Sequence, residues 1–333
     1  MKRLLLSLAT ASFATGALAA FPINSNPANS FLLGATGYYL RASATNGDFD
    51  YASNDAFFAD KAHGFIDNLD PSYDWGWGIH GTYFAPNGVN DITIRYFHSH
   101  NTDTDSDASA IGEGISSFVN AIDAGFSGSN VTASMKAKVD QVDLIGGQNI
   151  GIRSCLNLHP FFGLRWAEIK RSLDSAIYDN VVDRFMVTHN HSRFEGLGPV
   201  LGMDANYFLT PEFSLVARMG TALLVGEVKP HLAFFSNDNP NVAAPGAADF
   251  HPKTSSHRVV PVIDMKLGAD YTYMFNSSTI SAMSLELGWK FTEYFNVNDN
   301  INATAAPLVA ATIRSSSADL SLQGPYAELS VAF

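Results

Sequence analysis

The chain has 333 residues, a net charge of −12 at pH 7 and only 16% charged residues, against 46% hydrophobic ones. An acidic chain repels the phosphate backbone of nucleic acids, so this charge excludes nucleic acid as a partner. Cys155 is the only cysteine, which excludes an intramolecular disulfide framework.

The N-terminus has the features of a secretory signal peptide. The basic pair Lys2-Arg3 precedes an apolar run over residues 4–14, and small residues follow at 17 and 19. We expect cleavage after Ala19, with Ala20 as the near alternative. No later segment offers about 18 consecutive apolar residues, so the mature chain either is soluble in an exported compartment or crosses a membrane as strands.

Ten segments alternate between apolar and polar residues with the period of two that indicates β-strands. In chain order they are 31–41, 73–84, 91–98, 135–150, 161–171, 193–207, 213–228, 259–275, 279–291 and 317–333. The alternation is clearest in the second segment, where Trp75, Trp77 and Ile79 alternate with small or polar residues. One face of each strand is therefore suited to lipid and the other to water.

The connections between these strands fall into two classes. Short ones lie at 86–90, 151–157, 209–212 and 276–278, and they alternate with long ones at about 44–72, 99–133, 172–190, 229–256 and 297–316. This pattern predicts an all-β fold, a transmembrane antiparallel up-and-down β-barrel of about ten strands with short periplasmic turns and long extracellular loops. A hairpin hidden in a long loop would make twelve. A soluble sandwich is the alternative, but its outer face would carry many more Lys and Glu.

Aromatic residues gather near the predicted periplasmic strand ends, where amphipathic rings can lie among lipid headgroups. This predicted belt consists of Tyr83, Tyr96, Phe161, Tyr207, Phe213, Tyr271, Tyr273 and Phe333. The last strand ends on the outward positions Leu329, Val331 and Phe333, which we interpret as a terminal assembly signal for the barrel assembly machinery. Outer-membrane lipid and lipopolysaccharide are the other expected partners.

Several strands and turns resemble the Legionella major outer membrane protein family. The matching stretches are 158–173 (LHPFFGLRWAEIKRSL), 194–228 (FEGLGPVLGMDANYFLTPEFSLVARMGTALLVGEV), 259–273 (VVPVIDMKLGADYTY) and 319–333 (DLSLQGPYAELSVAF). The likeness continues more loosely over 75–148, and the first 70 residues match in layout only. The resemblance implies a porin-like, surface-exposed barrel, with no catalytic motif to carry over.

Charged residues fall on the inward face near the middle of several strands, where they can set the ion and solute preference of a polar lumen. The lumen-lining candidates are Arg95, Arg165, Asp204, Arg218, Asp264, Lys266, Glu286 and Lys290. The alternative is a lumen closed by ion pairs. Ten strands enclose a radius of only about 10 Å, and inward side chains fill most of it.

The second long connection contains apolar residues at helical spacing over 107–126, with Asp107 as a capping residue. This pattern predicts a short amphipathic helix. The helix either constricts the lumen or packs locally at the rim.

Two His-x-His pairs, His98 with His100 and His189 with His191, place two imidazoles on one strand face, as transition-metal sites require. No cysteine completes either pair, so we predict no metal site.

Asp103, Asp105 and Asp107 follow the first histidine pair and resemble an acid and base cluster. A solvated acidic loop is the simpler interpretation of these residues. The mature chain has no Gly-x-Ser-x-Gly motif, and we expect no enzyme activity.

The sequence thus predicts a signal peptide over 1–19 and a single outer-membrane barrel over 20–333 in a Gram-negative cell. The expected function is passive diffusion of ions and small hydrophilic solutes through a narrow polar lumen, without a cofactor. The alternative is a surface-exposed adhesin that acts through its extracellular loops. Assembly into a homo-oligomer is an expectation from analogy with porins.

Overall fold

A computed structural model describes residues 30–45, 49–55, 65–87, 89–108, 114–117, 130–179, 184–236, 246–250, 256–275, 279–306 and 309–333. The predicted signal peptide lies outside these residues. No helix in the described part of the chain is long and apolar enough to cross a membrane.

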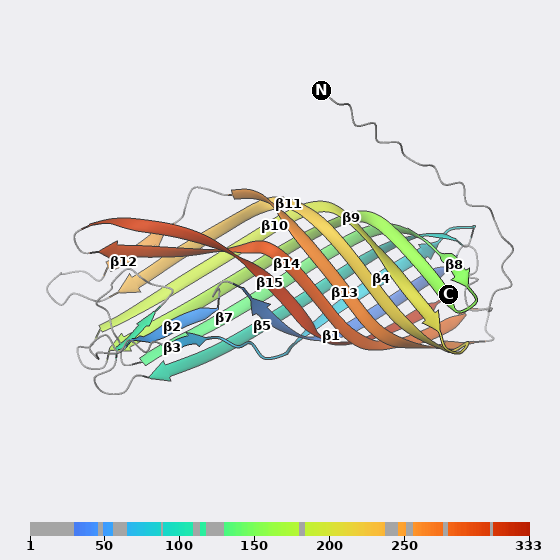
Figure 1. Cartoon of the computed structure of the whole chain (residues 1–333), viewed down its shortest axis with the longest axis horizontal. Helices are drawn as coiled ribbons and strands as arrows, with labels where there is room; N and C mark the ends of the chain where they lie inside the picture. The colour runs from blue at the N-terminus through green and yellow to red at the C-terminus, as the bar shows by residue number, and fades with distance from the viewer. Residues whose placement is uncertain are drawn as a thin grey trace, which may run out of the picture.

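Ten antiparallel strands form a closed barrel (Figure 1). They are β1 (Phe31–Ala44), β4 (Asp74–Phe84), β5 (Asn90–Ala108), β7 (Asn130–Gln148), β9 (Leu156–Asp179), β10 (Arg184–Phe208), β11 (Phe213–Ser236), β13 (Ser256–Met274), β14 (Ala282–Ala306) and β15 (Val309–Ala332). Each pairs with the next, and β1 pairs with both β4 and β15, which closes the ring. The structure therefore confirms the predicted up-and-down barrel.

In the described part of the chain, five further strands lie outside this ring. The short strands β8 (Ile150–Arg153) and β12 (Gly246–Phe250) pair with β9 and β11, and Cys155 lies in the two-residue turn between β8 and β9. A separate small sheet contains β2 (Asp50–Asp55), β3 (Phe65–Asn68) and β6 (Gly114–Ser117). The extra strands do not add a hairpin to the barrel wall, so the barrel has ten strands rather than twelve.

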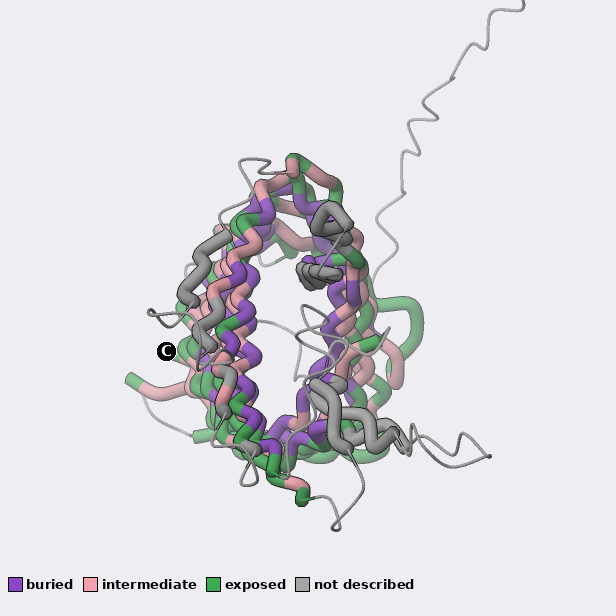
Figure 2. The backbone as a smooth tube through the Cα atoms, turned by 90° about the vertical axis from the view of Figure 1, so that its left-hand side faces the viewer, coloured by how far each residue is buried: buried purple, intermediate pink, exposed green. Residues whose placement is uncertain are grey.

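Apolar side chains cover the outside of the wall. On β4 the exposed fractions of Trp75, Trp77 and Ile79 are 70%, 49% and 54%, and on β13 that of Leu267 is 65%. A soluble sandwich would bury these residues, because its apolar face forms the core. Viewed along the barrel, the strands form a closed oval ring (Figure 2). A closed ring with apolar side chains on its outer face is expected for a wall that faces lipid.

The strands extend far beyond the predicted segments at one end of the barrel. We call this end the loop end, and the end with the short turns and Phe333 the turn end. The predicted long connections at 172–190 and 297–316 are largely strand, since β10 and β14 each have 25 residues. The reason is that the inward apolar pattern continues past the membrane, as the buried residues Leu173 and Ile177 show.

Two charged rows lie beyond the apolar band on the outer face of β7, β9, β10 and β11. The first row is acidic and consists of the cross-strand neighbours Asp140, Glu168, Glu195 and Glu227. The second row, closer to the loop end, is basic and consists of Lys138, Lys170, Arg193 and Lys229. On the turn-end side of both rows lie the apolar cross-strand neighbours Trp166, Leu197 and Val225. The rows therefore mark the loop-side limit of the membrane-spanning wall on these strands.

Two local predictions are wrong. Phe161 does not belong to the aromatic belt. The even-numbered residues of β9 point outward, so Phe161 points into the barrel, where its exposed fraction is only 7%. The predicted helix over 107–126 is not formed where the structure describes it: Asp107 lies in β5 and Gly114–Ser117 is strand β6. Backbone N–H and C=O groups of β6 form hydrogen bonds with β2, in place of the internal hydrogen bonds that a helix would have formed.

Candidate functional site in the barrel lumen

A cavity of about 350 Å³ lies inside the turn-end half of the barrel. Its lining reaches from Ala282 and Ala332, near the turn end, to Phe97 and Gln141, near the middle of the barrel. The eight predicted lumen residues all line it, namely Arg95, Arg165, Asp204, Arg218, Asp264, Lys266, Glu286 and Lys290. The period-two alternation of the strands brings these eight side chains together.

Arg165 joins two carboxylates from different parts of the wall. Its Nε and Nη2 donate hydrogen bonds of 2.7 and 2.8 Å to the two carboxylate oxygens of Asp143 on the neighbouring strand. Its Nη1 binds Asp264 on β13, although β10 and β11 separate these strands in the sheet. The Thr292 hydroxyl donates a 2.8 Å hydrogen bond to the other oxygen of Asp264. These contacts hold the guanidinium across the lumen.

A second cluster lies around Asp204. Arg218 Nε donates a 2.8 Å hydrogen bond to Asp204 Oδ1, and Arg95 Nη2 lies 3.6 Å from Asp204 Oδ2. His159 bridges two acids, with Nδ1 at 3.5 Å from Asp204 and Nε2 at 2.7 Å from Asp91. This cluster connects β5, β9, β10 and β11, so it supports the wall as well as charging the cavity.

Lysine and tyrosine side chains form a third cluster. Lys266 Nζ lies 3.3 Å from Glu328 and 4.6 Å from the ring centroid of Tyr326. The Tyr326 hydroxyl in turn donates a hydrogen bond to Glu286. Tyr38 lies between two lysines, with Lys266 Nζ at 5.2 Å and Lys290 Nζ at 5.6 Å from its ring centroid. Aromatic faces stabilise these ammonium groups in addition to the carboxylates.

The lumen charges are buried against each other. The exposed fractions of Arg165, Asp204 and Lys290 are 4%, 7% and 6%. In a wide water-filled channel such side chains would be much more exposed. The cavity is therefore a narrow polar space surrounded by paired charges.

The interior of the loop-end half is packed. Leu40, Met135, Ile169, Phe194 and Leu320 are all fully or almost fully buried and belong to one connected core. The wall also contacts itself there, because the Asp299 amide on β14 donates a 3.1 Å hydrogen bond to the Ser192 hydroxyl on β10. Passage through the barrel requires these side chains to move.

Sequence reasoning missed several residues of the site. Asp143, Glu328, His80, His159 and Tyr38 line the same cavity. The signal for Glu328 was present, since Leu329, Val331 and Phe333 point outward and an even-numbered neighbour must point inward. The pairing of these residues across the lumen has no comparable signal in the sequence.

The acidic run after the first histidine pair does not form an acid and base cluster. Asp103, Asp105 and Asp107 lie on one face of β5, whereas His98 and His100 lie on the other, because side chains alternate along a strand. His98 Nδ1 lies 2.8 Å from Asp140 Oδ1 on the outer surface. The two sets of residues therefore do not converge on a common site.

The chain is similar to several solved structures at very low sequence identity. The outer membrane protease OmpT of Escherichia coli is 7% identical, with 91% of this chain and 97% of that chain covered and a TM-score of 0.43. The toluene transporter TodX of Pseudomonas putida is 10% identical, with 92% and 89% covered and a TM-score of 0.29. A FadL homologue of Pseudomonas aeruginosa is also 10% identical, with 92% and 90% covered and a TM-score of 0.23.

No curated protein sequence matches the chain. A family model described as the Legionella pneumophila major outer membrane protein precursor matches residues 24–333, nearly the whole chain. The match covers all ten strands of the barrel wall. The chain therefore belongs to this family of outer-membrane β-barrel proteins, the Legionella major outer membrane protein family.

Proposed function

We propose that the protein is a narrow, non-enzymatic pore that lets ions and small hydrophilic solutes diffuse across the outer membrane. The observation that carries this proposal is the polar cavity of about 350 Å³ inside a closed, lipid-facing barrel. A barrel that served only as an anchor could fill this space with apolar side chains at lower energetic cost. A charged cavity is instead what ions require along their path.

The packed loop-end half determines how often and how widely this pore opens. Phe194, Met135 and Leu40 must separate before water can fill the barrel, and apolar constrictions close by dewetting. We therefore expect brief, small conductance steps rather than the steady current of a wide porin.

The cavity lining should favour cations. Among the described lining residues, seven are carboxylates, namely Asp91, Asp143, Asp204, Asp264, Asp270, Glu286 and Glu328. Five are basic, namely Arg95, Arg165, Arg218, Lys266 and Lys290. Even when His159, whose two ring nitrogens face Asp91 and Asp204, is counted as a sixth cation, one negative charge remains in excess, and a narrow path concentrates its effect on passing ions.

The test is single-channel recording of the refolded protein in planar bilayers under a salt gradient. Glu286→Gln is the best variant, because glutamine can still accept the hydrogen bond from the Tyr326 hydroxyl while the charge is removed. We expect discrete steps in the wild type and a lower cation preference in this variant. Glu227→Gln is the control, since it removes one negative charge from the outer surface.

Two results would contradict the proposal. The first is the absence of steps from protein that shows heat-modifiable gel mobility and strand-rich circular dichroism. The second is an equal change of ion preference in Glu286→Gln and Glu227→Gln, because a pore must sense the lumen charge more strongly than the outer one.

A contact role at the cell surface is the second candidate. The packed interior of the loop-end half favours it, because this core holds the strand extensions as a rigid support for the loops. Deletion of residues 234–250 should then abolish adhesion and leave any conductance unchanged. The charged rows on the outer face of β7 to β11 support contact with outer-membrane lipid and lipopolysaccharide in either case.

A further inference from the structure

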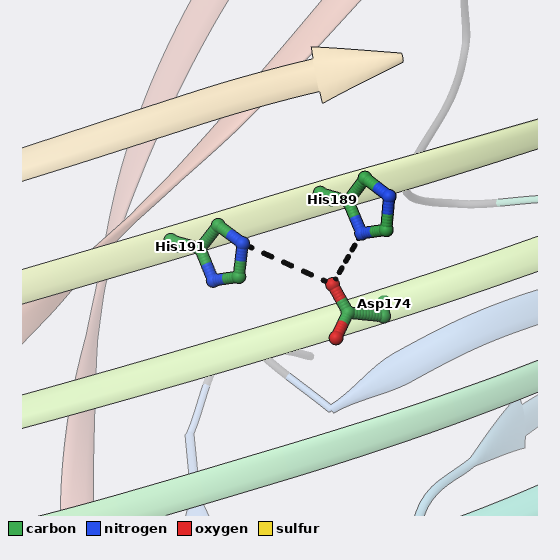
Figure 3. Close-up of side chains that lie close together, drawn as sticks. All are labelled: Asp174, His189 and His191. Atoms are coloured by element: carbon green, nitrogen blue, oxygen red, sulfur yellow. Dashed lines mark hydrogen bonds and ion pairs between the residues drawn. The ribbon is translucent and has the colours of Figure 1, made fainter. Parts of the chain in front are cut away.

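Three side chains with metal-binding atoms meet on the outer surface of the loop-end half (Figure 3). They are Asp174 on β9 and His189 and His191 on β10. His189 Nδ1 lies 2.7 Å and His191 Nε2 lies 4.0 Å from Asp174 Oδ1. All three ligand atoms lie within 4.8 Å of one another.

The strand register brings these residues together. Asp174 pairs directly with His189, and the i, i+2 spacing places His191 on the same face of β10. On the other side of β10, His191 pairs with His231 of β11, and their rings stack with centroids 6.0 Å apart. Three imidazoles and one carboxylate thus form a row across three neighbouring strands.

The carboxylate is oriented toward the histidines. The Ser172 hydroxyl donates a 3.1 Å hydrogen bond to Asp174 Oδ2, which leaves Oδ1 directed at both imidazoles. Outer hydrogen bonds of this kind orient metal ligands and contribute to affinity. The side chains of Asp174, His189 and His191 are 32%, 50% and 43% exposed, so an ion from the medium can reach them.

We propose that Asp174, His189 and His191 bind a divalent transition metal of the zinc class, with water completing the coordination. Ligands of tetrahedral zinc lie about 2.0–2.2 Å from the ion, so neighbouring ligand atoms are about 3.3 Å apart. The observed separations of 2.7 and 4.0 Å fall on either side of this value, and the two imidazole rings, which lie parallel with an interplanar angle of 3°, would turn toward the ion on binding. Imidazole nitrogen with one carboxylate suits zinc, copper or nickel rather than calcium or magnesium.

The metal would connect β9 to β10 above the membrane. The other histidine pair differs in one decisive respect. Lys138 Nζ lies 3.1 Å from Asp140, the carboxylate that binds His98, and Lys138 is also the direct cross-strand partner of His100. An ammonium group beside both histidines repels a cation, so this pair serves as a matched control.

The test is titration of the refolded barrel, prepared without a polyhistidine tag, with Co²⁺ and then with Zn²⁺ as competitor. We expect one Co²⁺ per chain, a visible absorption spectrum typical of low coordination number, and displacement of the Co²⁺ by Zn²⁺. His191→Gln and Asp174→Asn should each weaken binding about tenfold or more, and the double variant His98→Gln/His100→Gln should bind like the wild type.

Two outcomes would overturn the proposal. One is the absence of a stoichiometric Co²⁺ signal from the wild-type barrel with correct heat-modifiable gel mobility. The other is equal binding by the wild type, His191→Gln and Asp174→Asn, which would place the metal elsewhere. The same gel mobility, measured for every variant, separates loss of the site from loss of the fold.

Discussion

Tyr294 on β14 donates a 2.7 Å hydrogen bond from its hydroxyl to Oε1 of Gln141 on β7, the strand directly opposite it in the ten-strand ring. Both side chains are buried. Gln141 Nε2 lies 3.2 Å from both carboxylate oxygens of Asp143, the partner of Arg165. A chain of hydrogen bonds therefore crosses the lumen where the cavity ends and the packed half begins.

Removal of the Tyr294 ring should enlarge the conductance of the barrel. Tyr294→Ala deletes the side chain that spans the lumen, whereas Tyr294→Phe deletes only its hydrogen bond. We expect larger and longer single-channel steps from the alanine variant and nearly wild-type steps from the phenylalanine variant. Large-to-small changes of buried aromatics cost about 3–5 kcal/mol, so gel mobility must confirm that the alanine variant folds. Steps of unchanged amplitude in a folded Tyr294→Ala barrel would show that this bridge is not the constriction.

Loss of Arg165 should destabilise the barrel strongly. Arg165→Met leaves the buried Asp143 and the partly buried Asp264 without their shared cation, and breaking a buried pair costs about 3–5 kcal/mol. The measurement is the urea midpoint of unfolding in detergent micelles, followed by tryptophan fluorescence. Adding Asp143→Asn and Asp264→Asn should restore much of the loss, because no carboxylate then remains unpaired. Arg193→Met on the outer surface is the control, and an equal loss in both single variants would contradict the expectation.

Gly226 should not tolerate a methyl group. A Cβ at this position would lie 2.2 Å from the backbone oxygen of Glu195 and 2.7 Å from Cε2 of the buried Phe194 ring. Overpacking of this kind costs about 1–3 kcal/mol, so Gly226→Ala should lower the urea midpoint. Gly37→Ala is the matched control, because no heavy atom lies within 4 Å of its added Cβ. Equal midpoints for the two variants would refute the packing of Phe194 against this glycine.

Glu168 lies in the acidic row beyond the apolar band, and it should make the stability of the barrel depend on pH. Burial acts to raise the pKa of Glu168, but Lys170 and Arg193 together lower it below the ordinary value of 4.5. A carboxyl with a lowered folded-state pKa stabilises the fold fully above the unfolded-state pKa, and this contribution disappears as the pH falls through the folded-state pKa. The difference in urea midpoint between the wild type and Glu168→Gln should therefore be constant from pH 7 to about pH 5 and shrink below pH 4.5.

A matched variant isolates this effect. Glu195→Gln removes a carboxylate from the same row, but Glu195 is about half exposed and lies 3.3 Å from Arg193. Its midpoint should differ little from the wild type at any pH, since exposed ion pairs contribute little. A pH-independent difference for Glu168→Gln would instead indicate a packing effect of the substitution.

The sequence alone determined the wall of this protein. Because side chains alternate strictly along a strand, Trp75, Trp77 and Leu267 had to face lipid once Gly76, Gly78 and Lys266 faced inward. The same rule placed Arg165 and Glu286 on the lumen side, and the alternation of short and long connections fixed the order of the strands.

Only the tertiary structure decided what lies inside that wall. Tyr294 and Gln141 meet because ring closure places β14 opposite β7, and Arg165 reaches Asp264 because the curvature of the wall brings β9 near β13. Asp174 joins His189 only through the register of β9 with β10. A period of two specifies the face of each residue but not its partner, since partners depend on register, strand number and closure.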